Sequence, residues 1–262
     1  MRVPKVVFSI FFAFVLTISL AAQQTITSNP QALSLLQRSL NALSAGQSVP
    51  SDVTLSGTAR RIAGSDDDTG TAVLRAISSG ASRIDLSLSS GQRSEILNTS
   101  VSPAAGSWSG PDGVTHFISN HNLLTGPAWF FPVFPIVRAL SQSGYVATYV
   151  GHEMHNGQAV EHVAVSQTFP PGIPSLQHLT QIDFFLDAST HLPAALTFNV
   201  HPDNDMGLDI PIEIRFSDYR GVNGVQVPFR VQKYLNNGLV LDLQFQSVVF
   251  NTGLTSSSFS AQ

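Results

Sequence analysis

The sequence of 262 residues contains no cysteine, few charged residues and only two lysines, Lys5 and Lys233. The absence of cysteine excludes disulfide bonds, thiolate metal sites and attachment of a lipid to an N-terminal cysteine. Charged residues make up 11% of the chain and form no basic stripe, so nucleic acid is not an expected partner. Packing alone must therefore stabilise the fold, and the chain is long enough to bury a substantial core.

The first 22 residues differ in composition from the rest of the chain. Arg2 and Lys5 precede the uncharged run VVFSIFFAFVLTISL, and small residues follow at Ser19 and Ala21. This order is typical of a cleaved signal peptide, so residues 23–262 are predicted to form the mature, periplasmic or secreted protein. A retained transmembrane anchor is the alternative, because the run is near the minimum length that spans a bilayer. Cleavage would remove two basic residues and change the net charge from −4 to −6.

One amphipathic helix is predicted over about residues 30–45, followed by a long series of strands. Its apolar stripe consists of Leu33, Leu36, Leu40 and Leu43. Ser28 is the predicted N-cap, and Gly46 is predicted to end the helix. Beyond it, apolar and polar residues alternate with a period of two in the segments RIDLSLSS, DIPIEIRFSDYR, VQVPFRVQ and LDLQFQS. Alternation of this kind indicates an antiparallel sheet with one solvated face, and nine or more strands are expected in one domain, residues 23–262.

The middle of the chain holds the most aromatic stretch, PAWFFPVFP, within residues 127–143. Pro132 and Pro135 exclude a continuous helix across it, but a helix from Pro135 to Ser143 is expected. Its aromatic residues are Trp129, Phe130, Phe131 and Phe134. They are predicted to form a lid or wall of a hydrophobic cavity that binds a ligand. Core packing under the sheet and a membrane-facing wedge are the alternatives.

The stretch GHEMHNGQAVEH, residues 151–162, superficially resembles a zinc-hydrolase motif. That motif needs two histidines four residues apart on a helix, whereas here the spacing is three and the flanks read as strands. Asn156-Gly157 instead predicts a two-residue hairpin turn. The predicted facing pairs are His155 with Gln158, His152 with Glu161 and Gly151 with His162, with Glu153 approaching His162 diagonally. The histidines then lie on two faces of the sheet.

Two metal sites are alternatives to simple turns and hairpins. A metal-dependent enzyme would need Glu153 and His162 to meet a third ligand such as His116 or His121. Separately, DNDMGLD offers Asp203, Asp205 and Asp209 for a weakly bound calcium ion, but it lacks the glycine and terminal glutamate of the helix-loop-helix calcium site. A solvated hairpin loop is the simpler interpretation, so neither a metal nor a cofactor is predicted.

Three motifs in the last third of the chain resemble a known family. They are LDASTHLP at 186–193, FSDYRGVNGVQVPFRV at 216–231 and VVFNTGL at 248–254. Together with the order of the predicted elements, they resemble the periplasmic outer-membrane lipoprotein-sorting carriers, the LolA/LolB-like proteins. This resemblance implies a mainly β fold with a few helices: an unclosed antiparallel half-barrel whose N-terminal and mid-chain helices cover the concave apolar face.

Composition and resemblance together predict an exported binding protein that is not an enzyme. Its hydrophobic cavity is expected to take a lipid, an acyl chain or a lipid-modified protein, in envelope lipoprotein handling or a related task. A monomer with at most peripheral membrane contact is expected. An envelope sensor or adaptor that binds another protein through the same fold stays open as an alternative, as do a structural envelope component and the metal-dependent enzyme.

Overall fold

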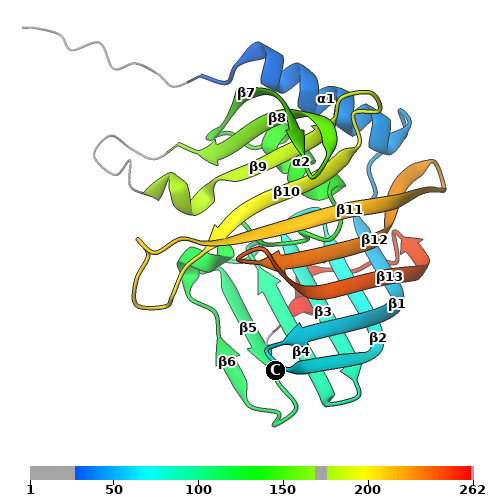
Figure 1. The fold of residues 1–262 in the computed structure, drawn as a ribbon, viewed down its shortest axis with the longest axis vertical. Coiled ribbons are helices and arrows are strands. Elements are labelled where there is room, and N and C mark those ends of the chain that lie inside the picture. The colour runs from blue at the N-terminus through cyan, green and yellow to red at the C-terminus, as the bar shows by residue number, and fades with distance from the viewer. Residues whose placement is uncertain (1–26, 169–175, 261–262) are drawn as a thin grey trace, which may run out of the picture.

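In the computed structural model, which describes residues 27–168 and 176–260, thirteen antiparallel strands form one sheet that does not close (Figure 1). The predicted signal peptide lies outside the described residues. The strands are β1 (Asp52–Ala63), β2 (Asp66–Ile77), β3 (Ala81–Leu88), β4 (Gly91–Asn98), β5 (Ala105–Ser109), β6 (Thr115–Phe117), β7 (Tyr145–His155), β8 (Gln158–Gln167), β9 (Ile182–Asp187), β10 (Pro193–Val200), β11 (Ile210–Val222), β12 (Val225–Leu235) and β13 (Gly238–Phe250). β1 pairs with β13, so β6 and β7 are the two sheet edges. The predicted unclosed, mainly β fold is confirmed.

The alternating sequence segments decide which face of the sheet is buried. Ile212, Ile214 and Phe216 of β11 are all buried, and so are the alternating apolar residues of β3, β12 and β13. The predicted turns also form: Asn156 and Gly157 have φ of 51° and 79°, and Asn223-Gly224 follows the same pattern. Two successive positive φ angles match the right-handed twist of the flanking strands.

Helix α1 (Pro30–Ser44) forms close to its predicted bounds, but its N-cap and its buried stripe differ from the prediction. Asn29 is the N-cap, because its side chain accepts a hydrogen bond from the N–H of Ala32. The Ser28 hydroxyl instead accepts from the N–H of Ala147, which ties the start of the helix to β7. Leu33 is 37% exposed, and the buried residues of the helix are Ala32, Leu35, Leu36, Ser39, Leu43 and Ser44.

Helix α2 (Val133–Ser141) begins two residues before the predicted start at Pro135 and ends two residues before Ser143. Pro132 is its N-cap and Pro135 lies in its first turn, where the N–H groups have no intrahelical acceptor to lose. As predicted, both helices lie against the apolar face: α1 packs on α2, β7, β8 and β12, and Figure 1 shows both beside the upper half of the sheet. No helix among the described residues is long and apolar enough to span a membrane. The short 3-10 helices are η1 (Asn120–Leu123), η3 (His178–Thr180) and η4 (Ser256–Phe259).

Side-chain hydrogen bonds hold the backbone of the three family-like motifs, at 186–193, 216–231 and 248–254, in place. The Asp187 carboxylate accepts from Gln158 and from the backbone and hydroxyl groups of Ser189 and Thr190, which closes the β9–β10 turn. Burial raises the pKa of Asp187, but these hydrogen bonds outweigh it and hold the pKa far below its usual value. The Tyr219 hydroxyl of the second motif donates to the carbonyl of Pro193 in the first, at 2.8 Å.

The third motif is tied to the start of β1 by a buried carboxylate. Asp52 accepts from the Thr252 N–H at 2.8 Å, the Thr252 hydroxyl at 2.9 Å, the Gly253 N–H at 3.0 Å and the Leu254 N–H at 3.3 Å. Burial raises the pKa of Asp52, but the four hydrogen bonds together lower it below its usual value. The segment after β13 is thereby anchored beside the β1–β13 ladder.

Candidate functional site

A cavity of about 830 Å³ opens on the apolar face of the sheet. Its apolar wall includes Ile84 and Leu86 of β3, Ile212 of β11 and Leu241 of β13, all of which belong to the main core. Neither α1 nor α2 contributes a lining residue. The helices fill the apolar face over β7, β8 and β12, and the cavity occupies the part of that face that they leave uncovered.

The predicted aromatic group divides between the cavity wall and the core. Trp129 lines the cavity, is 3% exposed and contacts Phe130 edge to face at 5.6 Å between ring centroids. The other three residues, Phe130, Phe131 and Phe134, are buried in the main core, where Phe131 and Phe134 pack edge to face at 4.8 Å. The mid-chain segment therefore supplies both core packing and one wall residue, and ligand contact by this group stays a prediction.

Trp108 of β5 also lines the cavity, so both tryptophans of the chain face it. Trp108 is 44% exposed and its ring stacks on His116 at 4.2 Å between centroids. In the strand register it lies opposite Glu95 of β4, which in turn lies opposite Ile84. Apolar and polar residues do not alternate around this short strand, and the sheet register alone places Trp108 on the cavity side.

Three cationic side chains, Arg61, Arg93 and Lys233, line the same cavity together with one carboxylate, Glu95. Lys233 lies opposite Leu241, which lies opposite Arg61 on the other side, so both cations are on the apolar face. The Lys233 Nζ is 5.0 Å from the centroid of the Trp129 ring, a cation–π contact. Lys233 was not among the predicted site residues, although it continues the period-two series of buried residues in β12 and is the one lysine after the apolar N-terminal run.

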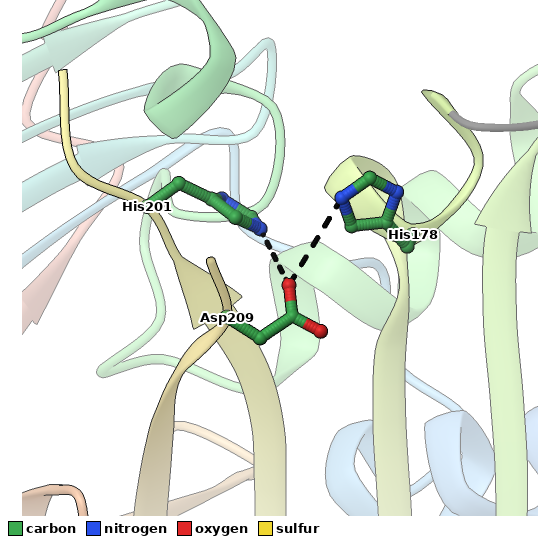
Figure 2. A group of neighbouring side chains, drawn as sticks. All are labelled: His178, His201 and Asp209. Atoms are coloured by element: carbon green, nitrogen blue, oxygen red, sulfur yellow. Dashed lines mark hydrogen bonds and ion pairs between the residues drawn. The ribbon is translucent and has the colours of Figure 1, made fainter. Parts of the chain in front are cut away.

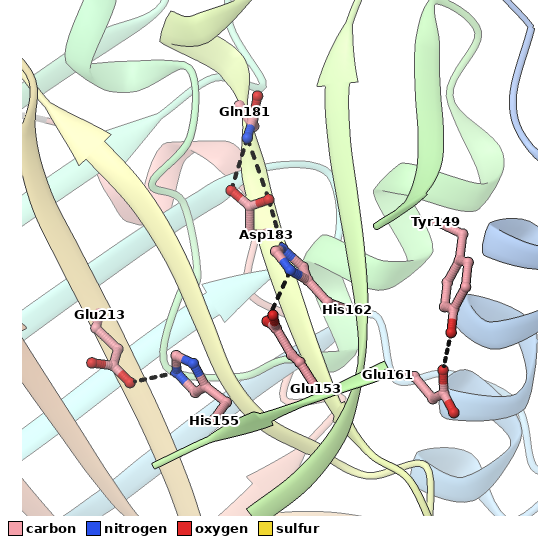
Figure 3. A network of polar contacts seen from close by, with 8 residues as sticks. All are labelled: Tyr149, Glu153, His155, Glu161, His162, Gln181, Asp183 and Glu213. Carbon is pink, nitrogen blue, oxygen red and sulfur yellow. Dashed lines mark hydrogen bonds and ion pairs between the residues drawn. The ribbon is translucent and has the colours of Figure 1, made fainter. Parts of the chain in front are cut away.

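The hairpin of residues 151–162 forms with the predicted register, so every predicted facing pair is confirmed. His152 Nδ1 is 3.2 Å from Glu161 Oε1. Glu161 also accepts a hydrogen bond from the Tyr149 hydroxyl at 2.7 Å, and Figure 3 shows this pair next to α1. The Tyr149 hydrogen bond is the main cause that lowers the pKa of Glu161. His162 lies on the opposite face of the hairpin.

His162 is held between two carboxylates, as Figure 3 shows. Its Nδ1 is 3.1 Å from Glu153 Oε1, which confirms the predicted diagonal approach, and its Nε2 is 2.9 Å from Asp183 Oδ1. The third ligands considered for a metal-dependent enzyme do not join this pair. His116 is on β6, at the opposite edge of the sheet from the β7–β8 hairpin, and His121 packs near His201 at 6.0 Å.

A different trio, His178, His201 and Asp209, brings ligand atoms within 4.8 Å of one another (Figure 2). Two imidazoles and a carboxylate are a ligand set that divalent transition metals accept. In the described residues these groups already bond to protein: His201 Nε2 is 2.9 Å from Asp209 Oδ1, and His178 Nε2 is 3.0 Å from the carbonyl of Met206. The trio therefore links η3 to the loop between β10 and β11 through hydrogen bonds and ion pairs.

The three aspartates considered for calcium have separate partners. Asp203 accepts from the Ser119 hydroxyl, Asp205 from the N–H of Gly207, and Asp209 bonds to His201. Two of these contacts close the loop itself, and the third ties it to the residue before η1. The loop is thus explained by local hydrogen bonding, in line with the simpler interpretation of its sequence.

No protein-family model matches the chain, and no curated protein matches it in sequence. Solved structures do match in fold. A domain assigned to the outer membrane lipoprotein-sorting proteins, from Vibrio parahaemolyticus, has a TM-score of 0.55 and 14% identity, over 87% of this chain and 96% of that one. A LolA superfamily protein of Nitrosomonas europaea has a TM-score of 0.54 and 13% identity, over 88% and 97%.

A DUF1329 family protein of Desulfovibrio piger is similar at a TM-score of 0.53 and 9% identity, over 88% of this chain and 96% of that one. At such identities the shared property is the fold, and it extends over most of the chain. The class is therefore that of open, helix-covered antiparallel half-barrels. Within that class the chain has the LolA-like fold, which confirms the resemblance drawn from its motifs.

Proposed function

We propose that this protein is an exported carrier that binds acyl chains in the cavity on its concave face and catalyses no reaction. The cavity itself is the observation that carries the proposal. Its volume of about 830 Å³ falls within the roughly 300–1,000 Å³ typical of small-molecule sites. Its apolar wall removes methylene groups from water, and each buried methylene contributes about 0.8 kcal/mol.

The burial of the sheet residues supports this assignment. Ile84, Leu86 and Leu241 at the cavity are 6–8% exposed, whereas Val231 and Leu243 deeper in the same core are fully buried. Those lining side chains pack in the core, and the small part of their apolar surface that stays accessible lines the cavity. A flexible acyl chain would cover this surface without any change in the strand register.

The first test is a chain-length series with straight-chain C8, C10 and C12 acids and alcohols. Affinity should rise by up to about fourfold for each added methylene, because about 0.8 kcal/mol corresponds to that factor. Since both tryptophans line the cavity, intrinsic fluorescence reports binding directly. Affinity that does not depend on chain length, or no binding of either series, would overturn the proposal.

A matched pair of variants locates the binding. Leu86→Trp places a larger side chain in the cavity, whereas Val249→Trp adds the same side chain at an exposed position outside the cavity lining. Isothermal titration calorimetry with dodecanoate should show at least tenfold weaker binding for Leu86→Trp and unchanged binding for Val249→Trp. Equal effects in the two variants would place the bound chain elsewhere.

Export and the natural ligand need measurements on protein taken from cells. N-terminal sequencing of the mature protein should find the chain beginning near residue 23, and fractionation should find it in the envelope or the medium. Mass spectrometry of organic extracts of the natively purified protein should then show an enriched acyl lipid. An intact Met1 in a membrane-bound form would support the anchor alternative instead.

An adaptor that binds another protein is a second candidate, and one observation favours it. At the free β6 edge, Val114 is 51% exposed and Phe117 is 81% exposed. A sheet edge with exposed apolar residues is a surface on which another strand can pair. If this edge binds a partner, Phe117→Ser should abolish a pull-down interaction that Leu86→Trp leaves intact, and the reverse pattern would assign the interaction to the cavity.

A further inference from the structure

We infer that the cavity is built for an amphiphile with an anionic head group, which Lys233 and Arg93 recognise with Arg61 beside them. This inference rests on the proposed function and adds the chemical class of the ligand. The shared chemistry is an oxyanion, either a carboxylate or a phosphate, on a single acyl chain. The evidence is the placement, the pairing and the charge of the cations in the cavity wall.

Placement is the first observation. In β12 the inward-facing series Val227, Phe229 and Val231 continues to Lys233, where the pattern calls for an apolar residue. In β4, Arg93 lies opposite the buried Leu86, so it too is on the apolar face. Cations on the apolar face of a sheet carry a desolvation cost, and such residues are retained mainly where they have a partner.

Pairing is the second observation. Of the described residues, no carboxylate lies within 4.0 Å of Arg93 or Lys233. The Arg93 Nε is buried and has no hydrogen-bond partner among them, and the same is true of Arg61 Nη1, whose nearest carboxylate, Asp68, is 3.9 Å away. By contrast, Arg60 on the other face of β1 makes two hydrogen bonds to Asp67, at 2.6 and 2.7 Å.

Charge is the third observation. The cavity lining holds three cations and one carboxylate, Glu95, and a second carboxylate, Asp68, lies 3.9 Å from Arg61, so the local balance is positive whereas the whole chain has a net charge of −4. The local excess is thus opposite in sign to that of the protein. An oxyanion would accept hydrogen bonds from the Arg93 guanidinium and from the Lys233 ammonium, and charge-assisted hydrogen bonds of this kind are about twice as strong as neutral ones.

The arrangement gives the ligand a direction. Trp129 contacts the Lys233 ammonium through its ring face and borders the helix-filled core, so it fixes the cation at the cavity wall. The apolar side chains Ile84, Leu86 and Ile212 supply the surface for the acyl chain. A neutral alcohol of the same length would gain the chain contacts but would offer the cations only an uncharged acceptor, which forms weaker hydrogen bonds.

The test compares four ligands with one dodecyl chain: dodecanoate, dodecyl phosphate, 1-dodecanol and dodecyltrimethylammonium. Tryptophan fluorescence titrations should show the two anions binding roughly tenfold or more tightly than the alcohol, as expected for charge-assisted contacts, and the cation binding least. Higher salt should weaken the binding of the two anions and leave the binding of the alcohol unchanged. Inorganic phosphate alone should not bind; if it binds in a Lys233-dependent way, the site is one for a free anion and the amphiphile assignment is wrong.

Variants separate this inference from the proposed function. Lys233→Met and Arg93→Met should each weaken anion binding about tenfold and leave 1-dodecanol unchanged. Arg60→Met is the matched control, because it removes one positive charge from the solvated face of β1 next to Arg61. Equal affinity for dodecanoate and 1-dodecanol, or equal effects of Lys233→Met and Arg60→Met, would overturn the anionic head group while the carrier function stands. If none of the four ligands binds, the proposed carrier function is overturned.

Discussion

The buried carboxylate of Asp52 allows a quantitative test of how the chain is held together. Asp52→Asn keeps the size of the side chain but replaces one acceptor oxygen with an NH₂ donor. One oxygen of Asp52 accepts two hydrogen bonds from Thr252, and the other accepts from the N–H groups of Gly253 and Leu254. Whichever way the amide is oriented, two of these four donors lose their acceptor and face another donor.

Hydrogen bonds to charged groups contribute about 1.5–3 kcal/mol each when both partners are desolvated. The backbone after β13 is more exposed than Asp52 itself, so water partly replaces the lost acceptor. We therefore expect Asp52→Asn to lower the free energy of unfolding by about 1.5–3 kcal/mol at pH 7. For a domain of this size, that corresponds to a fall in Tm of roughly 3–12 °C.

The same substitution has a defined pH dependence. The pKa of Asp52 is lowered in the folded state, so its contribution is fully present above its unfolded pKa and is lost as the pH falls through the folded pKa. Urea denaturation from pH 7 to pH 3 should therefore show that the difference in free energy of unfolding between the wild type and Asp52→Asn, here called the gap, narrows below about pH 4. Asp67→Asn, in an exposed pair with Arg60, is the control and should change little. A gap below about 0.5 kcal/mol at pH 7, or one that does not narrow in acid, would refute the reasoning.

Three further substitutions test the core, the motif contacts and the turns. Phe131→Ala empties a fully buried position and should cost about 3–5 kcal/mol in urea denaturation; a cost below about 1 kcal/mol would contradict its place in the core. Tyr219→Phe removes the hydrogen bond to the Pro193 carbonyl and should cost about 0.5–1.5 kcal/mol, and an unchanged denaturation midpoint would show that the two motifs are not coupled there. Asn223→Val forces a β-branched residue into φ of 48° and should cost about 1–2 kcal/mol, while Asn223→Gly, its control, should change thermal stability little.

The hairpin and strand predictions succeeded because they depend on local rules. Once Asn156 and Gly157 form the turn, the register of every residue back to His152 and forward to Glu161 follows by counting. The same logic placed Ile212 and Ile214 on the buried face. The predicted helix ends were less accurate. Asn29 and Ser28 can both cap a helix, and Asn29 is the N-cap because the Ser28 hydroxyl is used by the Ala147 N–H of β7.

The candidate site could be predicted only in part. The aromatic segment was found from composition, but its sequence does not say which ring faces a cavity and which faces the core. Trp129 and Phe130 are neighbours in the chain, and they differ because only Trp129 reaches the cavity wall next to Lys233. Lys233 itself carried a signal, as the lysine that interrupts the buried series of β12, which a strict reading of that pattern would have detected.

The sequence by itself determined the strands, their buried faces and their turns, because alternation and positive-φ residues act over a few neighbouring positions. Tertiary structure decided everything that joins distant segments. The pairing of β1 with β13 brings Arg61 beside Leu241, with Lys233 on the other side of Leu241, and the limited reach of the two helices leaves part of the apolar face open as a cavity. Neither fact can be counted along the chain, since each depends on how far the sheet curves and on how much of its face two short helices can cover.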